Sequence, residues 1–330
     1  MSLDFLRVIA AFAVVFLHVS SRVVVYYPDV HSMMWWTGNI ADAFVRWSVP
    51  VFVMISGALV FSSSSDITPI QYYKKRAFRL FPPIIFWTLV YFSVREYTQS
   101  SFNLNSAVES LVDGTPYYHL WYVYMIVGLY LAAPFLRPMV AGVDSGSLRL
   151  LIAGCFTIAA IESLMGGTSA TFLPRFLPFL GYFLAGHYLL SHGSKLSNRL
   201  LVSVFLVCGG IVAVGTAALF PQLGQRSWDV MYNYLNPVVI IMSLCIFLLF
   251  TKNSNPLWMP ASLVRRIAPI TLGIYLVHPL WLMLLSEFRI SGFMMHPAVG
   301  IPVTTLLAFM LSAASAALLA NIPFLKRTVC

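Results

Sequence analysis

MSLDFLRVIAAFAVVFLHVSSRVVV, residues 1–25, is an apolar run long enough to cross a bilayer, and it holds Arg7 and His18 with ten residues between them. About 20 apolar residues in a helix span the hydrocarbon core. Eleven steps along a helix bring His18 back to within about 20° of Arg7, about 16 Å further along the axis. Both side chains therefore face one side of a single membrane helix.

Charged residues inside a membrane helix are costly, so this pair predicts a polar environment. An ionised side chain near the bilayer centre costs about 2.5–3.5 kcal/mol on insertion scales, and such residues generally face a cavity or the interior of a helix bundle. Asp4, three residues before Arg7, lies on the same helical face and is the expected charge partner. We expect Arg7 and His18 to face an inward passage.

The composition excludes a soluble globular protein. Of the 330 residues, 59% are hydrophobic and only 9% are charged, and the mean hydropathy is +0.83. The first run has Asp4 and Arg7 near its start, is too long for a signal peptide and lacks an A-x-A cleavage pattern, so we expect it to remain in the protein. The four cysteines show no paired spacing, so neither a disulfide nor a metal site is expected.

Apolar runs along the whole chain predict an all-α polytopic membrane protein with about ten transmembrane helices and a single domain over 1–330. No sequence repeat and no large soluble insertion is found between the runs. The predicted spans lie near 5–25, 40–61, 83–94, 120–136, 150–164, 176–190, 200–219, 237–250, 270–285 and 298–319.

The distribution of basic residues predicts the orientation. Thirteen of the 20 Lys and Arg residues fall in the loops 62–82, 137–149, 191–199 and 251–269 and in the tail after 320, whereas six fall in the alternate loops. By the positive-inside rule, both termini are expected to be cytoplasmic. This explains the net charge of +9 better than nucleic-acid binding does, because the cations do not form one soluble face.

The longest outer loop, about 95–118, is predicted to contain a short interfacial helix. Ser106 and Glu109 have the spacing of a capping box, and Gly114 is expected to end the helix.

His18 is the main candidate for catalysis. A neutral imidazole in a dry cavity can take a proton from a hydroxyl group. The alternative is a histidine that only hydrogen-bonds a neighbouring helix. The fixed relation to Arg7 favours the catalytic role.

A basic motif precedes the third span. Arg76 and Arg79 are three residues apart and share a helical face, an arrangement that suits a phosphate group, and Lys75 lies beside them. Any inner loop should be basic, so orientation alone is an equal alternative for these residues.

The outer end of the fourth span is a candidate acceptor site. Aromatic rings usually settle at the headgroup level, which explains Trp121 as an anchor but leaves His119 unexplained. Aromatic faces and an imidazole would also suit a sugar ring. Glu162, near the outer end of the fifth span, is a weaker acceptor-site candidate.

Other polar residues are predicted to be mainly structural. Asp42 and Arg46 have the i,i+4 spacing of a salt bridge. His278, before Pro279 in the ninth span, is as consistent with a structural role as with a functional one, and His187 is interpreted as structural.

Six short motifs together resemble the membrane-bound acyltransferase 3 family. They are LDFLR at 3–7, Arg-x10-His ending at His18, VFVMISGAL at 51–59, Arg-x-x-Arg at 76–79, YHLWYV at 118–123 and TLGIYLVHP at 271–279. Each is short, but their order relative to the spans makes the joint signal specific. One departure is Thr271 and Gly273, where the family pattern leads us to expect two serines.

The resemblance implies an O-acetyltransferase in the bacterial inner membrane. It would move an acetyl group from cytoplasmic acetyl-CoA, its donor rather than a resident cofactor, to a hydroxyl of a surface glycan or a lipid-linked precursor. Arg7 and His18 would be the essential pair, and Arg76 and Arg79 would serve the donor. A small-solute transporter or flippase would also need buried ionisable residues, and a non-catalytic assembly partner is a third possibility. The lack of internal repeats counts modestly against a transporter.

Overall fold

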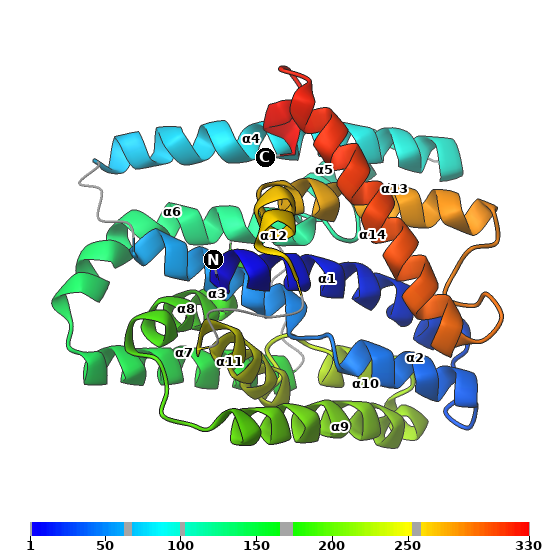
Figure 1. The fold of residues 1–330 in the computed structure, drawn as a ribbon, viewed down its shortest axis with the longest axis horizontal. Helices are drawn as coiled ribbons and strands as arrows, with labels where there is room; N and C mark the ends of the chain where they lie inside the picture. Colours follow the sequence, from blue (N-terminus) through cyan, green and yellow to red (C-terminus); the bar gives the residue numbers. More distant parts are fainter. Residues whose placement is uncertain (1, 63–67, 100–102, 166–173, 253–258, 330) are drawn as a thin grey trace.

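The computed structural model describes residues 2–62, 68–99, 103–165, 174–252 and 259–329, and these contain helices and no β-strand (Figure 1). The helices are α1 Ser2–Tyr26, α2 Met33–Ala43, α3 Ser48–Phe61, α4 Pro69–Gln99, α5 Leu104–Val112, α6 Trp121–Gly142, α7 Ser145–Leu164, η1 Pro174–Phe179, α8 Leu180–His192, α9 Asn198–Leu223, α10 Arg226–Met231, α11 Pro237–Lys252, α12 Ala261–Ile267, η2 Ala268–Ile270, α13 Thr271–Glu287, α14 Pro297–Asn321 and η3 Lys326–Thr328.

Among the described residues, eight helical segments are long and apolar enough to cross a membrane. Each matches one predicted span. The other two predicted spans fall on α8 and α11, which have only 13 and 16 residues. Many residues of both helices belong to the main packed core. A helix that is largely buried in protein need not match the thickness of the hydrocarbon core. The chain is therefore an all-α, multi-pass membrane protein.

Helix α1 lies in the middle of the bundle and packs against α2, α3, α13 and α14 (Figure 1). In that view α1 and α4 run in one direction along the long axis, and α3 and α6 run back. We call the end of the bundle where α1 begins the inner end and the end where α1 finishes the outer end.

The predicted second span, 40–61, is longer than expected and is broken. It starts at Met33 and is interrupted between α2 and α3, at residues 44–47. Pro50 provides a reason, because it has no amide hydrogen to donate to the carbonyl four residues earlier, at Arg46. Irregular backbone at membrane depth is tolerated where it lines a cavity.

Two glycines bring α3 and α8 into backbone contact. A side chain at Gly57 would overlap the backbone carbonyl of Phe183, and one at Gly186 would overlap that of Met54. Small residues at such crossings let membrane helices approach closely.

The chain after α14 folds back onto the bundle. The Trp87 indole donates a hydrogen bond of 2.9 Å to the carbonyl oxygen of Thr328. The amide of Gly273 donates one of 3.1 Å to the carbonyl oxygen of Val329, a buried residue. A Cβ at position 273 would press on Val329 and Ala316, which explains glycine where a serine was expected.

The predicted helix of the outer loop is present as α5, and Gly114 follows it with a positive φ of 65°. The capping box was wrong, because Asn103 caps the helix by accepting from the amide of Asn105. The hydroxyl of Ser106 instead donates to the carbonyl of Asn103. Residues 100–102 of this loop lie outside the described residues.

Candidate active site

A cavity of about 230 Å³ in the inner half of the bundle brings together three of the predicted functional residues. Arg7 from α1 and Arg76 and Arg79 from α4 all line it. No Asp or Glu is among its described lining residues, so its polar character is cationic. Lys75 is exposed and does not line this cavity.

The arginines of the inner cavity are held in different ways. Arg7 forms the expected ion pair with Asp4 at 3.5 Å, and both side chains keep some exposure. The guanidinium carbon of Arg76 lies 4.6 Å from the ring centroid of Tyr130, a cation–π contact. Arg79 is exposed. Two fixed cations and one accessible cation therefore surround the space.

His18 lies beyond this cavity, in a cluster of three histidines. Its ring stacks on that of His278 with centroids 5.1 Å apart, and His278 in turn lies 5.4 Å from His119. The three residues come from α1, α13 and the segment before α6. The ring of Tyr118 also contacts that of His18, with centroids 5.1 Å apart.

A ring nitrogen in this cluster has no protein partner. His278 Nδ1 lies 2.6 Å from the carbonyl oxygen of Tyr275, which can only accept, so Nδ1 carries a proton. In the neutral ring His278 Nε2 is then a lone-pair acceptor, and it is buried without a partner. The cluster has unused hydrogen-bonding capacity in its interior.

Tyr275 connects the inner cavity to the histidine cluster. It lines the cavity, and its ring centroid lies 5.3 Å from that of His119 and 5.9 Å from that of His278. Its hydroxyl donates a hydrogen bond to the backbone carbonyl of His119. One aromatic ring therefore separates the cationic cavity from the imidazoles.

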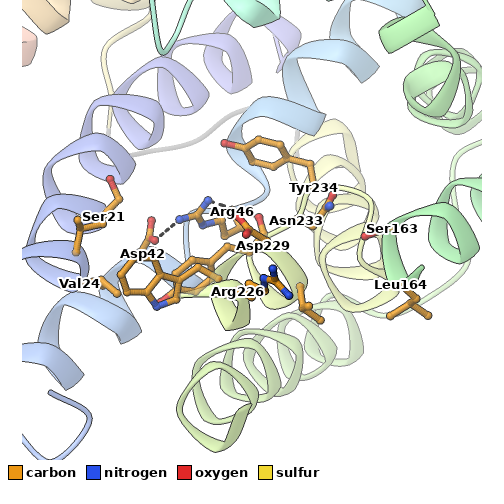
Figure 2. A pocket seen from close by; sticks show the side chains of 14 residues that line it. Ser21, Val24, Asp42, Arg46, Ser163, Leu164, Arg226, Asp229, Asn233 and Tyr234 are labelled. Carbon is orange, nitrogen blue, oxygen red and sulfur yellow. Dashed lines mark hydrogen bonds and ion pairs between the residues drawn. The ribbon is translucent and has the colours of Figure 1, made fainter. Parts of the chain in front are cut away.

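A larger cavity of about 720 Å³ lies in the outer half of the bundle (Figure 2). It is bordered by the end of α1, the break between α2 and α3, the end of α7 and the segment from α10 to Tyr234. Ser21, one turn after His18, belongs to its wall. His18 is thus flanked by the two cavities along α1.

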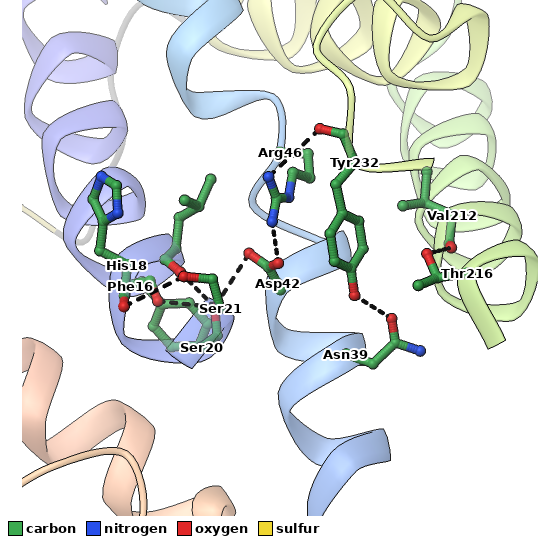
Figure 3. Close-up of polar contacts among 11 residues, drawn as sticks. Phe16, His18, Ser20, Ser21, Asn39, Asp42, Arg46, Val212, Thr216 and Tyr232 are labelled. Atoms are coloured by element: carbon green, nitrogen blue, oxygen red, sulfur yellow. Dashed lines mark hydrogen bonds and ion pairs between the residues drawn. The ribbon is translucent and has the colours of Figure 1, made fainter. Parts of the chain in front are cut away.

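The Asp42–Arg46 ion pair forms as predicted and lines the outer cavity. Figure 3 shows a wider network around it, in which the Ser20 hydroxyl donates to Asp42 at 3.5 Å and Arg46 donates to the carbonyl of Tyr232. The Tyr232 hydroxyl donates to Asn39. This network fixes the irregular backbone of the second span against α1 and the segment after α10.

The residues predicted for an acceptor do not line the outer cavity. His119 is buried in the histidine cluster, and Glu162 is half-buried, although the next residue, Ser163, does line the cavity. Trp121 does not line the cavity, but its ring stacks on that of the lining residue Tyr234, with centroids 5.7 Å apart. Their predicted roles stay predictions.

Sequence reasoning missed His278 as a partner of His18 and missed the whole segment 226–234. The TLGIYLVHP motif was a signal for His278. Within the described residues, no group of three or more His, Cys, Asp or Glu side chains is arranged to hold a metal ion.

A family model described as an acyltransferase domain matches residues 2–319, nearly the whole chain. The chain belongs to the acyltransferase 3 family. No curated protein and no solved structure matches it. In this membrane acyltransferase, the inner cavity, the histidine cluster and the outer cavity all lie within the matched residues.

Proposed function

We propose that this acyltransferase moves an acetyl group from cytoplasmic acetyl-CoA to a hydroxyl of a cell-surface glycan or its lipid-linked precursor. The observation that carries the proposal is the position of His18 between a cationic inner cavity and a larger outer cavity. A donor and an acceptor that approach from opposite sides of a membrane need such an arrangement.

The inner cavity suits the donor. Arg76, Arg79 and Arg7 are cations that can pair with the phosphates of CoA, and Arg is well suited to phosphate because its guanidinium binds two oxygens at once. A volume of about 230 Å³ is small for a nucleotide but fits an extended pantetheine arm. The rise of about 16 Å from Arg7 to His18 is comparable to the reach of that arm.

In this proposal His18 acts as a general base. It takes the proton of the acceptor hydroxyl as the oxygen attacks the thioester carbonyl, the carbon–sulfur bond breaks, and the departing CoA thiolate takes the proton from His18. Such catalysis is worth about 10²–10⁴-fold. In a covalent variant, His18 first accepts the acetyl group and then passes it to the acceptor.

The localisation follows from the donor. Because acetyl-CoA is cytoplasmic, the inner end would face the cytoplasm of a bacterial inner membrane, with both termini on that side, as the positive-inside rule also predicts. The length and the stretch YHLWYVYMIVGLYLAAPF at 118–135 resemble the enterobacterial common antigen O-acetyltransferase, so that antigen is our proposed first acceptor to test.

The test is CoA release and product formation by purified protein in lipid nanodiscs, with envelope glycan from cells lacking the gene as acceptor. We expect the wild type to release free CoA thiol and to add an acetyl mass to the glycan. His18→Ala should lose both activities, whereas His187→Ala, a matched control for a histidine beside Phe61, should keep them.

Two outcomes would contradict the proposal. Full transfer by His18→Ala would exclude both versions of the mechanism. Movement of a solute or glycolipid without any CoA release would identify a transporter instead. Radiolabelled acetyl retained on the wild type, but not on His18→Ala, in the absence of acceptor would select the covalent variant.

A further inference from the structure

A third cavity, of about 200 Å³, lies at the outer end of the bundle between α1, α13 and α14. Its wall is formed by the last two turns of α1, the end of α13, the turn that joins α13 to α14, and α14 itself. It shares no lining residue with the inner cavity or the outer cavity. The proposed acyl transfer therefore gives this cavity no role.

Arg22 is the only charged side chain among the described lining residues of the third cavity. In the described part of the chain, ion pairs form at Arg7 and Arg46 but none forms at Arg22. Tyr118 interacts with the Arg22 side chain but brings no charge. The positive-inside rule does not explain a cation here, because the outer end should be poor in Lys and Arg. A partly buried guanidinium without a counter-charge is costly, so the cavity favours an anionic ligand.

The turn between α13 and α14 adds a hydrogen-bond donor to this wall. The Ser291 hydroxyl accepts from the amide of Phe293 at 3.3 Å and keeps its own hydrogen to donate. Gly292 lets the turn pack directly on α1, because a Cβ at this position would lie only 2.9 Å from a methyl group of Val23. The turn is thus held against the helix that carries Arg22.

Aromatic rings indicate that the third cavity lies at the level of the lipid head groups. Phe293 in its wall contacts the rings of Tyr26 and Tyr27, with centroids 5.5 and 5.2 Å apart. Both tyrosines are exposed where α1 ends, and such rings usually gather at the membrane–water interface. Leu282 and Ile290 also line the cavity and provide apolar surface for the carbon atoms next to a lipid head group.

We propose that the third cavity binds the phosphate group of a lipid in the leaflet at the outer end. The Arg22 guanidinium pairs with two phosphate oxygens, as its planar fork allows, and the Ser291 hydroxyl donates to one of them. A volume of about 200 Å³ is below the 300–1,000 Å³ typical of small-molecule sites. The cavity therefore holds a head group, and the acyl or prenyl chains stay in the bilayer.

Two kinds of lipid carry such a phosphate. A phospholipid would use Arg22 to fix the end of α1 to its leaflet. A lipid-linked glycan would bring its first sugar close to the histidine cluster, because Val19 in the cavity wall directly follows His18. Only this second source rests on the proposed acyl transfer.

The test is native mass spectrometry of the full chain after incubation with phosphatidylglycerol or with diacylglycerol, which has the same chains but no phosphate. We expect the wild type to retain phosphatidylglycerol and to lose diacylglycerol. Arg22→Gln should retain about tenfold less phosphatidylglycerol, the effect of a lost charged hydrogen bond. Arg289→Gln is the matched control, because Arg289 is exposed at the same end but does not line the cavity, and it should retain the wild-type amount.

Ser286→Leu gives an independent variant. Ser286 is an exposed residue that lines the cavity, so a larger side chain there narrows the cavity without crowding the core and should also reduce retention of phosphatidylglycerol. Thermal unfolding shows whether each variant is folded. A polyprenyl phosphate added as competitor then identifies the source of the phosphate. Displacement of phosphatidylglycerol would identify the lipid-linked precursor, and retention would identify the phospholipid.

Two results would overturn the assignment. One is equal retention of phosphatidylglycerol and diacylglycerol by the wild type. The other is wild-type retention of phosphatidylglycerol by both Arg22→Gln and Ser286→Leu in their folded state. Neither result bears on acyl transfer, which is measured as CoA release in the nanodisc assay. Absence of CoA release by a wild type that still retains the phospholipid would refute the proposed function and leave this site in place.

Discussion

The inner and outer cavities lie toward opposite ends of α1, but their polar side chains are arranged differently. The inner cavity is lined by three arginines and no carboxylate, whereas the outer cavity has equal numbers of acidic and basic residues. An excess of positive charge favours a phosphate-bearing ligand, and a balanced set of donors and acceptors favours an uncharged polar one. Under the proposed function, this contrast would let the enzyme distinguish its two substrates by charge.

The largest expected effect is a difference in stability between two ion pairs, Asp42–Arg46 at the outer cavity and Asp4–Arg7 at the inner end. Asp42 is buried and paired with Arg46, so Asp42→Asn leaves an uncompensated guanidinium and should reduce the free energy of unfolding by about 3–5 kcal/mol. Asp4→Asn is the matched change at the half-exposed inner pair and should cost about 1 kcal/mol or less. Denaturation in mild detergent measures the free energy of unfolding of both variants. Equal losses of stability would show that the burial of Asp42 does not make its ion pair more important.

The next effect concerns the donor. Arg79→Gln removes a cation from the inner cavity and should raise the KM for acetyl-CoA by about 10–100-fold, the range for a charged hydrogen bond. The acceptor KM should not move. Lys75→Gln is the control, because Lys75 lies outside the cavity wall. A similar effect of both changes would show that general positive charge, rather than the cavity, binds the donor.

A smaller effect, on kcat, is expected in the histidine cluster that lies between the two cavities. His278→Gln removes the stacked partner of His18 and should lower kcat by about tenfold, an effect of about 1.4 kcal/mol. Both Michaelis constants should stay near the wild-type values, because His278 lines neither cavity. An effect confined to KM would place His278 in substrate binding instead.

The smallest effect lies outside both cavities and depends on pH. Hydrogen bonds from the Ser147 hydroxyl and from the amides of Ser147 and Gly146 hold the pKa of Asp144 below the ordinary aspartate value. Asp144 caps the N-terminus of α7 through these hydrogen bonds. The stability that its carboxylate adds is complete above about pH 3.9, the ordinary aspartate pKa, and is lost as the pH falls through the lower pKa of the folded protein.

Asp144→Asn should remove this pH dependence without altering either Michaelis constant. The measurement is the difference in unfolding temperature between the wild type and the variant from pH 6 down to pH 3. A difference that does not change with pH would show that the charge on Asp144 contributes nothing to the cap.

The inner half of the molecule could be predicted from the sequence better than the outer half. Arg7 and Asp4 share one helical turn, and Arg76 and Arg79 share another, so helical periodicity was enough to put each pair on one face. The fold class and nearly all spans followed from hydropathy for the same reason, because each is a property of consecutive residues.

The outer cavity and the histidine pairing depend on tertiary contacts that local patterns do not contain. Ser163, Trp228 and Arg46 come from separate elements, and His18 meets His278 from the opposite end of the chain. The break before α3 was detectable in principle at Pro50, but hydropathy alone joined 40–61 into one span. The length of α4 was underestimated because its inner turns are polar yet remain helical.

The glycine crossing of α3 and α8 limits how the inner cavity can adapt its width. With backbone against backbone at Gly57 and Gly186, α3 cannot move toward α8, so extra width has to be gained from the wall that α4 provides. Leu80→Ala shortens a lining side chain of that wall, next to Arg79, and should raise the KM for acetyl-CoA without changing the acceptor KM. An unchanged donor KM would show that the width of this cavity does not affect donor binding.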